Sequence, residues 1–160
     1  MVVRAKVKQD DVAKALNLAL RCLTAREYTK VELTTRLNRN FTASATQQAV
    51  EKCVAEGWQS DERYADMLLR HCLAAGYGPL KFKFDAKRKG LRDDLIKTTC
   101  EGAAWTEAAC ALLQRRCDDP ASLDYLSKQK LLALLARRGF SGAQALSALN
   151  FLCSSADNGL

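Results

Sequence analysis

The chain has 160 residues, 48% of them hydrophobic and 27% charged, and this composition excludes an intrinsically disordered chain. Lysine and arginine outnumber aspartate and glutamate by 25 to 18, so the net charge is +7 and we expect a polyanionic partner, most commonly nucleic acid. No run approaches the roughly 18 apolar residues of a membrane span, and the N-terminus lacks the apolar core of a signal peptide, so we expect a cytoplasmic protein without a membrane partner.

Apolar residues recur at helical spacing along almost the whole chain and predict an all-helical fold. Gly57 is typical of a helix C-terminal stop, Ser60 of a helix N-cap, and Pro79 of the first position of a helix. Ser141 and Gln144 fit a capping box. In chain order, the predicted helices span about residues 12–23, 31–37, 42–56, 60–72, 79–89, 91–102, 104–116, 123–138 and 141–153.

These helices group in threes, and similar junctions join the second and third helix of each group. Each junction has a basic residue, then one that tolerates the left-handed conformation, then a large apolar residue. Their central residues, Asn40, Gly90 and Gly139, recur at about 50 residues, which predicts a tandem repeat of a three-helix unit. We expect a flexible basic arm at 1–10, repeats at 11–57, 58–103 and 104–153, and a disordered tail at 154–160.

Several of these segments together resemble the RecX family. Residues 56–65, EGWQSDERYA, have the family's Gly-aromatic pair, its acidic helix start and its aromatic–small pair. Residues 76–83, GYGPLKFK, match its G-x-G-P turn, and residues 134–141, LLARRGFS, match its third junction. Residues 28–37, YTKVELTTRL, match its opening helix. The chain departs from the family pattern in having Asn40, Phe84 and Ala86 where glycine, a polar residue and leucine are usual.

The resemblance implies three tandem three-helix repeats in an elongated, curved array. It also implies a negative regulator of the RecA recombinase in DNA recombination and repair. Such a protein binds the RecA filament on single-stranded DNA along its groove and inhibits its ATPase, its extension and strand exchange. We expect a monomer that is not an enzyme, that needs no cofactor, and that also contacts DNA weakly.

Three groups of basic residues are candidates for contact with DNA phosphates or with an acidic RecA surface. The alternative for each is an ordinary solvated helix face. For the pair Arg137 and Arg138, capping of a helix C-terminus is a further alternative. The predicted binding residues are Lys81, Lys83, Lys87, Arg88, Lys89 and Arg92 in the middle of the chain, Lys128, Lys130, Arg137 and Arg138 in the last repeat, and Arg36 and Arg39 in the first. Arg4, Lys6 and Lys8 would belong to the flexible arm.

Aromatic residues fall at the ends of predicted helices. Tyr28, Trp58 and Tyr77 could stack on bases, but we expect them, with Trp105, to be lids on the core of each repeat.

The residues offer no catalytic or metal site. His71 is the single histidine, and no nucleophile with an orienting carboxylate accompanies it. The 7 cysteines form no C-x-x-C pair, and an odd number favours reduced thiols. Cys110 and Cys117 lie two helical turns apart, too far to share a zinc ion. No glycine-rich phosphate loop occurs.

Two other functions remain open. The first is a stand-alone DNA-binding module, because trihelical units resemble helix-turn-helix folds. The second is a helical scaffold with no nucleic-acid role. DNA footprinting and binding assays would separate them.

Overall fold

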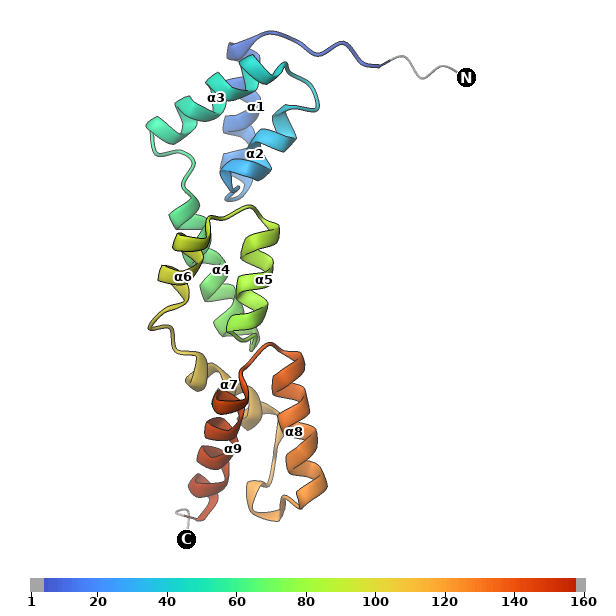
Figure 1. Ribbon diagram of the computed structural model, residues 1–160, viewed down its shortest axis with the longest axis vertical. Helices are drawn as coiled ribbons and strands as arrows, with labels where there is room; N and C mark the ends of the chain where they lie inside the picture. Colours follow the sequence, from blue (N-terminus) through green and yellow to red (C-terminus); the bar gives the residue numbers. More distant parts are fainter. Residues whose placement is uncertain (1–4, 158–160) are drawn as a thin grey trace. The chain divides into compact units, whose positions relative to one another are not determined.

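The computed structural model describes residues 5–157, and within them every regular element is helical apart from one isolated β-bridge (Figure 1). A short 3-10 helix, η1 (Pro120–Ser122), precedes α8. The α-helices are α1 (Val12–Ala25), α2 (Lys30–Leu37), α3 (Ala43–Ala55), α4 (Asp61–Ala75), α5 (Pro79–Arg88), α6 (Asp93–Cys100), α7 (Trp105–Arg116), α8 (Tyr125–Arg137) and α9 (Gly142–Asp157).

The chain divides into two compact parts. The first comprises Met1–Ala65 with Arg88–Arg92, and the second comprises Asp66–Lys87 with Asp93–Leu160. The first part holds α1, α2 and α3, and the second holds α7, α8 and α9 together with most of α4, α5 and α6.

The first three helices enclose a core of small and aliphatic side chains. Side-chain caps set where each helix begins: Asp11 accepts from the Lys14 N–H, Thr29 from the Glu32 N–H and Thr42 from the Ala45 N–H. The Glu32 carboxylate also accepts from the Thr29 N–H, which completes a capping box. The buried side chains of this core are Ala15, Ala19, Cys22, Leu33, Leu37, Phe41, Ala45, Ala49, Val50 and Cys53.

The second part has a core around Phe82 and another among α7, α8 and α9. Phe82 is completely buried, with its ring centroid 5.9 Å from that of Trp105. Trp105 is buried as predicted, and its Nε1–H donates to the Cys100 carbonyl over 3.0 Å. In contrast, Trp58 is 41% exposed, so the expectation of an aromatic lid is wrong there.

The second and third junctions have the predicted backbone, and the first does not. Gly90 and Gly139 have φ angles of 82° and 90°. No non-glycine residue in the described range has a positive φ, so Asn40 does not adopt the left-handed conformation. Instead, the N–H groups of Asn40 and Phe41 both donate to the Leu37 carbonyl, over 3.0 Å each, and this tight turn replaces the left-handed cap.

Helix ends meet at both of the glycine junctions. The first amides and last carbonyls of a helix lack partners within that helix. At the start of α5, the N–H groups of Gly78 and Leu80 donate to the carbonyls of Arg138 and Gly139 after α8, over 2.8 and 3.0 Å. At the start of α2, the Thr29 hydroxyl donates to the Lys89 carbonyl after α5, over 2.7 Å. The second helix of one repeat thus begins against the junction of the next in both places, which supports the tandem repeat.

Both ends of the described chain are more ordered than expected. Gln9 forms a parallel bridge with Phe41, so the segment before α1 is attached at this point and is not a free arm. Residues 1–4, including Arg4, lie outside the described residues. At the other end α9 continues to Asp157, and the hydroxyls of Ser154 and Ser155 donate to carbonyls one turn earlier in the helix. The expected tail at 154–160 is therefore helical up to Asp157.

Among the described residues, none of the helices combines the length and apolar character needed to cross a membrane.

Candidate nucleic-acid interface

Four of the predicted binding residues meet in one groove of the first compact part. We name this the junction groove; its volume is about 380 Å³. Arg36 and Arg39 come from the end of α2, while Arg88 and Lys89 come from the end of α5. The other lining residues are Arg26, Tyr28, Val31, Glu32 and Thr35. Segments that lie about 50 residues apart in the repeat pattern thus supply one basic surface.

Glu32 is the single carboxylate among the lining residues of the junction groove. It accepts a hydrogen bond from Lys89 Nζ at 2.7 Å and lies 3.5 Å from Arg26 Nη1. Burial is the largest influence and raises the pKa of Glu32, but the hydrogen bonds from Lys89 and the Thr29 N–H, with the charges of Lys89 and Arg26, lower it overall. In turn, the hydrogen bond to Glu32 raises the pKa of Lys89. One carboxylate faces five cations, so the groove keeps an excess of positive charge.

Arg26 is a member of this groove that the sequence reasoning missed. Its guanidinium carbon lies 3.6 Å from the centroid of the Tyr28 ring, a close cation–π contact. Tyr28 is half-buried, so the predicted lid carries an arginine on its outer side. In the sequence, the pattern Arg-x-Tyr before a helix start could have indicated this contact of Arg26 with Tyr28.

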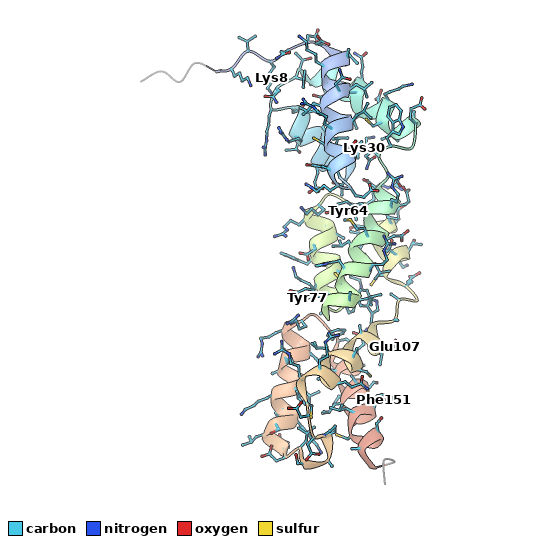
Figure 2. The ribbon with its side chains drawn as sticks, turned by 180° about the vertical axis from the view of Figure 1, so that it is seen from behind. Lys8, Lys30, Tyr64, Tyr77, Glu107 and Phe151 are labelled. Atoms are coloured by element: carbon cyan, nitrogen blue, oxygen red, sulfur yellow. The ribbon has the colours of Figure 1, made fainter. Side chains whose placement is uncertain are left out.

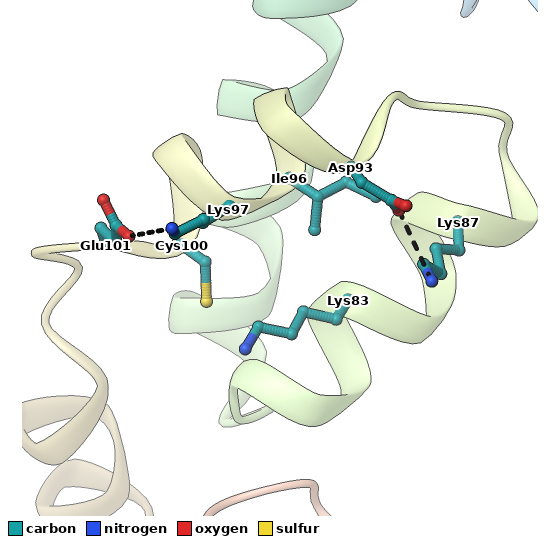
Figure 3. A pocket seen from close by; sticks show the side chains of 7 residues that line it. All are labelled: Lys83, Lys87, Asp93, Ile96, Lys97, Cys100 and Glu101. Carbon is teal, nitrogen blue, oxygen red and sulfur yellow. Dashed lines mark ion pairs between the residues drawn. The ribbon is translucent and has the colours of Figure 1, made fainter.

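Lys83 and Lys87 lie in a second, less basic groove between α5 and α6 (Figure 3). Its lining contains Lys97 as a third cation, with Ile96 and Cys100 as apolar side chains. Figure 3 shows ion pairs from Lys87 to Asp93, at 3.5 Å, and from Lys97 to Glu101, at 3.9 Å. The carboxylates of Asp93 and Glu101 offset most of this positive charge.

Lys81 and Arg138, two further predicted binding residues, also have structural partners. Lys81 Nζ pairs with Asp85 at 2.7 Å and lies over the rings of Tyr77 and Phe84. Arg138 donates to the Ala75 carbonyl over 3.2 Å, and its guanidinium carbon lies 5.0 Å from the centroid of the Tyr77 ring, labelled in Figure 2. The contacts of Arg138 join the end of α8 to the end of α4 and to Tyr77 in the turn before α5, whereas the pair of Lys81 with Asp85 lies within α5.

The remaining predicted residues do not line the junction groove or the α5–α6 groove. Arg92 is exposed just before α6. On α8, Lys130 and Arg137 are exposed, while Lys128 is half-buried. Their role as a binding face stays a prediction.

The first compact part has another basic groove, along α1, that the sequence reasoning did not find. We name it the α1 groove; its volume is about 530 Å³. Its cations are Lys6, Lys14, Arg21 and Arg36, and its other lining residues are Gln9, Asn17, Leu18, Asn40 and Phe41. Arg36 borders both this groove and the junction groove. The available signal was the spacing of Lys14 and Arg21, which places both on one face of α1.

The titratable groups elsewhere have ordinary structural roles. Within residues 5–157, no three His, Cys, Asp or Glu side chains lie where they could hold a metal ion. His71 is exposed, with its ring 6.4 Å from that of Tyr77. Burial, and secondarily the charge of Asp85, raises the pKa of the Cys72 thiol to about 11, and burial also raises the pKa of Cys53. Such thiols are poor nucleophiles, because the thiolate is the reactive form.

Family models match two segments of the chain. The model described as "RecX, second three-helix domain" matches residues 60–99, and that described as "RecX, third three-helix domain" matches residues 106–149.

Relatives and solved structures agree with these matches. The chain is 38% identical over 148 residues to the regulatory protein RecX of Xanthomonas campestris pv. campestris (strain B100), covering 90% of this chain and 88% of that protein. It is 36% identical over 138 residues to the regulatory protein RecX of Stenotrophomonas maltophilia (strain R551-3), covering 84% and 82%. The crystal structure of RecX from Lactobacillus salivarius has a similar fold, with a TM-score of 0.75 at 18% identity, over 91% of this chain and 96% of that one.

Proposed function

The chain belongs to the RecX family of regulatory proteins, and from this premise we propose that it is a negative regulator of the RecA recombinase. The proposed action is binding without catalysis. A monomer occupies the helical groove of the RecA filament on single-stranded DNA, in the cytoplasm. Occupation of that groove inhibits the ATPase, filament extension and strand exchange.

The junction groove is the observation that carries this proposal. Its lining contains five cations and one carboxylate, Glu32, which pairs with Lys89 at 2.7 Å and lies 3.5 Å from Arg26. A filament wound on DNA presents repeated negative charge, so a basic surface of this kind attracts it and speeds encounter.

Tandem repetition gives the second argument. Each repeat that contacts the filament holds the next one close to its own contact, which raises the effective concentration of that second contact. Several weak contacts then give tight binding overall. We therefore expect inhibition of the RecA ATPase at ratios of this protein to RecA well below one.

The test is a titration of the DNA-dependent ATPase of RecA, with capture of the protein on preformed RecA–DNA filaments as a second measurement. The double variant Arg39→Glu/Arg88→Glu should raise the half-inhibitory concentration about tenfold or more, because both charges in the groove reverse. The control variant Lys30→Glu/Lys52→Glu makes the same change in net charge at exposed residues outside both basic grooves. An ATPase rate that stays constant over the whole titration with the wild-type protein would remove the proposal.

The alternative function, a stand-alone helix-turn-helix DNA-binding module, has weaker support. In trihelical DNA-binding domains the third helix enters the major groove and carries the base and phosphate contacts. Here the third helices of the repeats are poor in cations: α3 contains Lys52, α6 contains Lys97, and α9 contains neither lysine nor arginine. A defined footprint on duplex DNA would favour this alternative over the action on RecA.

A further inference from the structure

The α5–α6 groove combines an apolar floor with a small excess of positive charge. Ile96 and Cys100 of α6 form the floor and are 4% and 9% exposed. The volume of the groove is about 430 Å³, within the range of roughly 300–1,000 Å³ that is typical of small-molecule sites. All of its lining residues belong to the second compact part. The aliphatic stems of its lysines add apolar surface, so the groove can cover a small apolar body.

The charges on the rim of the groove favour a ligand with one negative charge. Lys83, Lys87 and Lys97 line the groove together with two carboxylates, Asp93 and Glu101. Lys87 lies 3.5 Å from Asp93 and Lys97 lies 3.9 Å from Glu101, and all four side chains are at least 67% exposed, so water screens these pairs. A polyanion would meet both carboxylates and be repelled, whereas a single anionic group needs only the remaining cation.

Lys83 is the remaining cation, and its side chain reaches into the groove. Figure 3 shows it extending from α5 toward Cys100, and no ion pair joins it to the other residues drawn there. Burial raises the pKa of the Cys100 thiol, and the positive charge of Lys83 is the strongest of the influences that lower it. An anionic group that pairs with Lys83 therefore lies beside the apolar floor.

The lining also indicates the kind of apolar body that fits. None of the lining residues, all within the described chain, is aromatic, so stacking does not favour a flat ring. Ile96, Cys100 and the stems of the lysines offer aliphatic and thiol surface instead. A short aliphatic chain is complementary to such a surface, because its burial removes apolar area from water on both sides of the contact.

We propose that the α5–α6 groove binds a small amphipathic carboxylate, with its aliphatic chain on Ile96 and Cys100 and its carboxylate paired with Lys83. The covered chain excludes water from one side of the ion pair, which strengthens the attraction. Neither RecA nor nucleic acid takes part in this binding, so the site is independent of the proposed function.

The test uses octanoate as the probe, titrated into the isotope-labelled full chain and followed by amide chemical shifts in NMR spectra. Salt at about 150 mM screens general attraction to the basic surface. The shift changes should be largest at Lys83, Ile96 and Cys100, and their concentration dependence should give a dissociation constant of about 1 mM or below, as expected of a ligand of this size.

The charge of Lys83 should decide the affinity. Lys83→Glu should weaken the binding of octanoate about tenfold, because repulsion replaces attraction. Lys52→Glu makes the same change in net charge at an exposed residue of α3 outside this groove, and it should bind octanoate as the wild type does. Octanol, which has the same chain and no charge, should bind the wild type more weakly than octanoate. This preference should vanish in Lys83→Met, which keeps an apolar side chain without the ammonium group.

Three results would overturn the inference. One is equal affinity of the wild type for octanoate and octanol, because the carboxylate would then play no part. Another is equal weakening in Lys83→Glu and Lys52→Glu, because net charge and not the groove would then explain binding. The third is a set of shift changes confined to other surfaces, such as exposed Leu146 and Phe151 of α9. RecA is absent from these measurements, so failure here and failure of the proposed function are distinguishable.

Discussion

At the scale of single residues, Glu32 links the local structure of α2 to the next repeat. Its carboxylate closes the capping box at Thr29 and accepts from Lys89 Nζ, which follows α5. Two positively charged neighbours and a backbone N–H hold the pKa of Glu32 below its ordinary value, although burial, the largest single influence, acts in the opposite direction. Glu32 therefore orders the junction groove and also limits its positive charge.

Glu32→Gln should make the free energy of unfolding less dependent on pH in the acidic range. A carboxyl group whose pKa is lowered on folding stabilises the fold above its ordinary pKa, and this contribution is lost as the pH falls through the lowered value. The wild-type protein should therefore lose stability more steeply than the variant between about pH 5 and pH 3. Urea unfolding at a series of pH values measures this, and two parallel profiles would contradict it.

Glu32→Gln should also change the charge of the junction groove and hence its binding to RecA–DNA filaments. Removal of the one carboxylate increases the positive charge there, so capture on RecA–DNA filaments at low salt should be no weaker than for the wild type, provided that the fold is intact.

At the scale of elements, close contact between helix ends explains why glycine occupies positions 78 and 139. Gly78 immediately precedes α5, and its backbone lies directly against that of Gly139 after α8. A Cβ at Gly78 would approach the carbonyl carbon and oxygen of Gly139 to 2.4 Å, and backbone atoms cannot move aside as a flexible side chain can. Gly139 itself has a φ of 90° and would bring a Cβ to 2.6 Å from the Lys81 nitrogen. The contact between successive repeats thus depends on the absence of two side chains.

Gly78→Ala should lower the free energy of unfolding by about 1–3 kcal/mol, because the added methyl group separates two backbones that are hydrogen-bonded. The matched control is Gly142→Ala at the start of α9, where nothing lies within 4 Å of the added Cβ and φ is not positive. That control should leave stability unchanged or raise it slightly, because alanine has the higher helix propensity. Chemical unfolding measures both, and equal effects of the two substitutions would refute the explanation.

At the scale of the whole molecule, the basic residues do not form one even surface. The junction groove and the α1 groove hold most of the cations that are in excess, and both lie in the first compact part. In the second part, carboxylates pair with Lys81, Lys87 and Lys97.

Much of the fold could be predicted from the sequence because its determinants are local. Helix periodicity, the caps at Ser60 and Ser141, and the glycines at 90 and 139 each act within a few residues, and the structure has them as predicted. Asn40 is the exception, since the turn after α2 uses the Leu37 carbonyl and needs no left-handed residue.

The candidate site was predicted only in part. The density of basic residues in a segment does not show which of them pair with carboxylates and which line a groove in the folded protein. In the densest basic segment, around α5, Lys81 pairs with Asp85, Lys83 and Lys87 line the α5–α6 groove, and Arg88 and Lys89 line the junction groove. Arg26 and Arg21 stand alone in the sequence, yet each lines a basic groove in the structure.

By itself the sequence determined the helices, their ends and the three-helix repeat, since hydrogen bonds and side-chain periodicity within a helix depend on near neighbours. Only the tertiary structure decided which cations are neutralised and which converge, because the relevant contacts, such as Thr29 with Lys89 and Gln9 with Asn40, join residues far apart in the chain. Electrostatic attraction depends on distance in space and on exposure to water, and folding sets both.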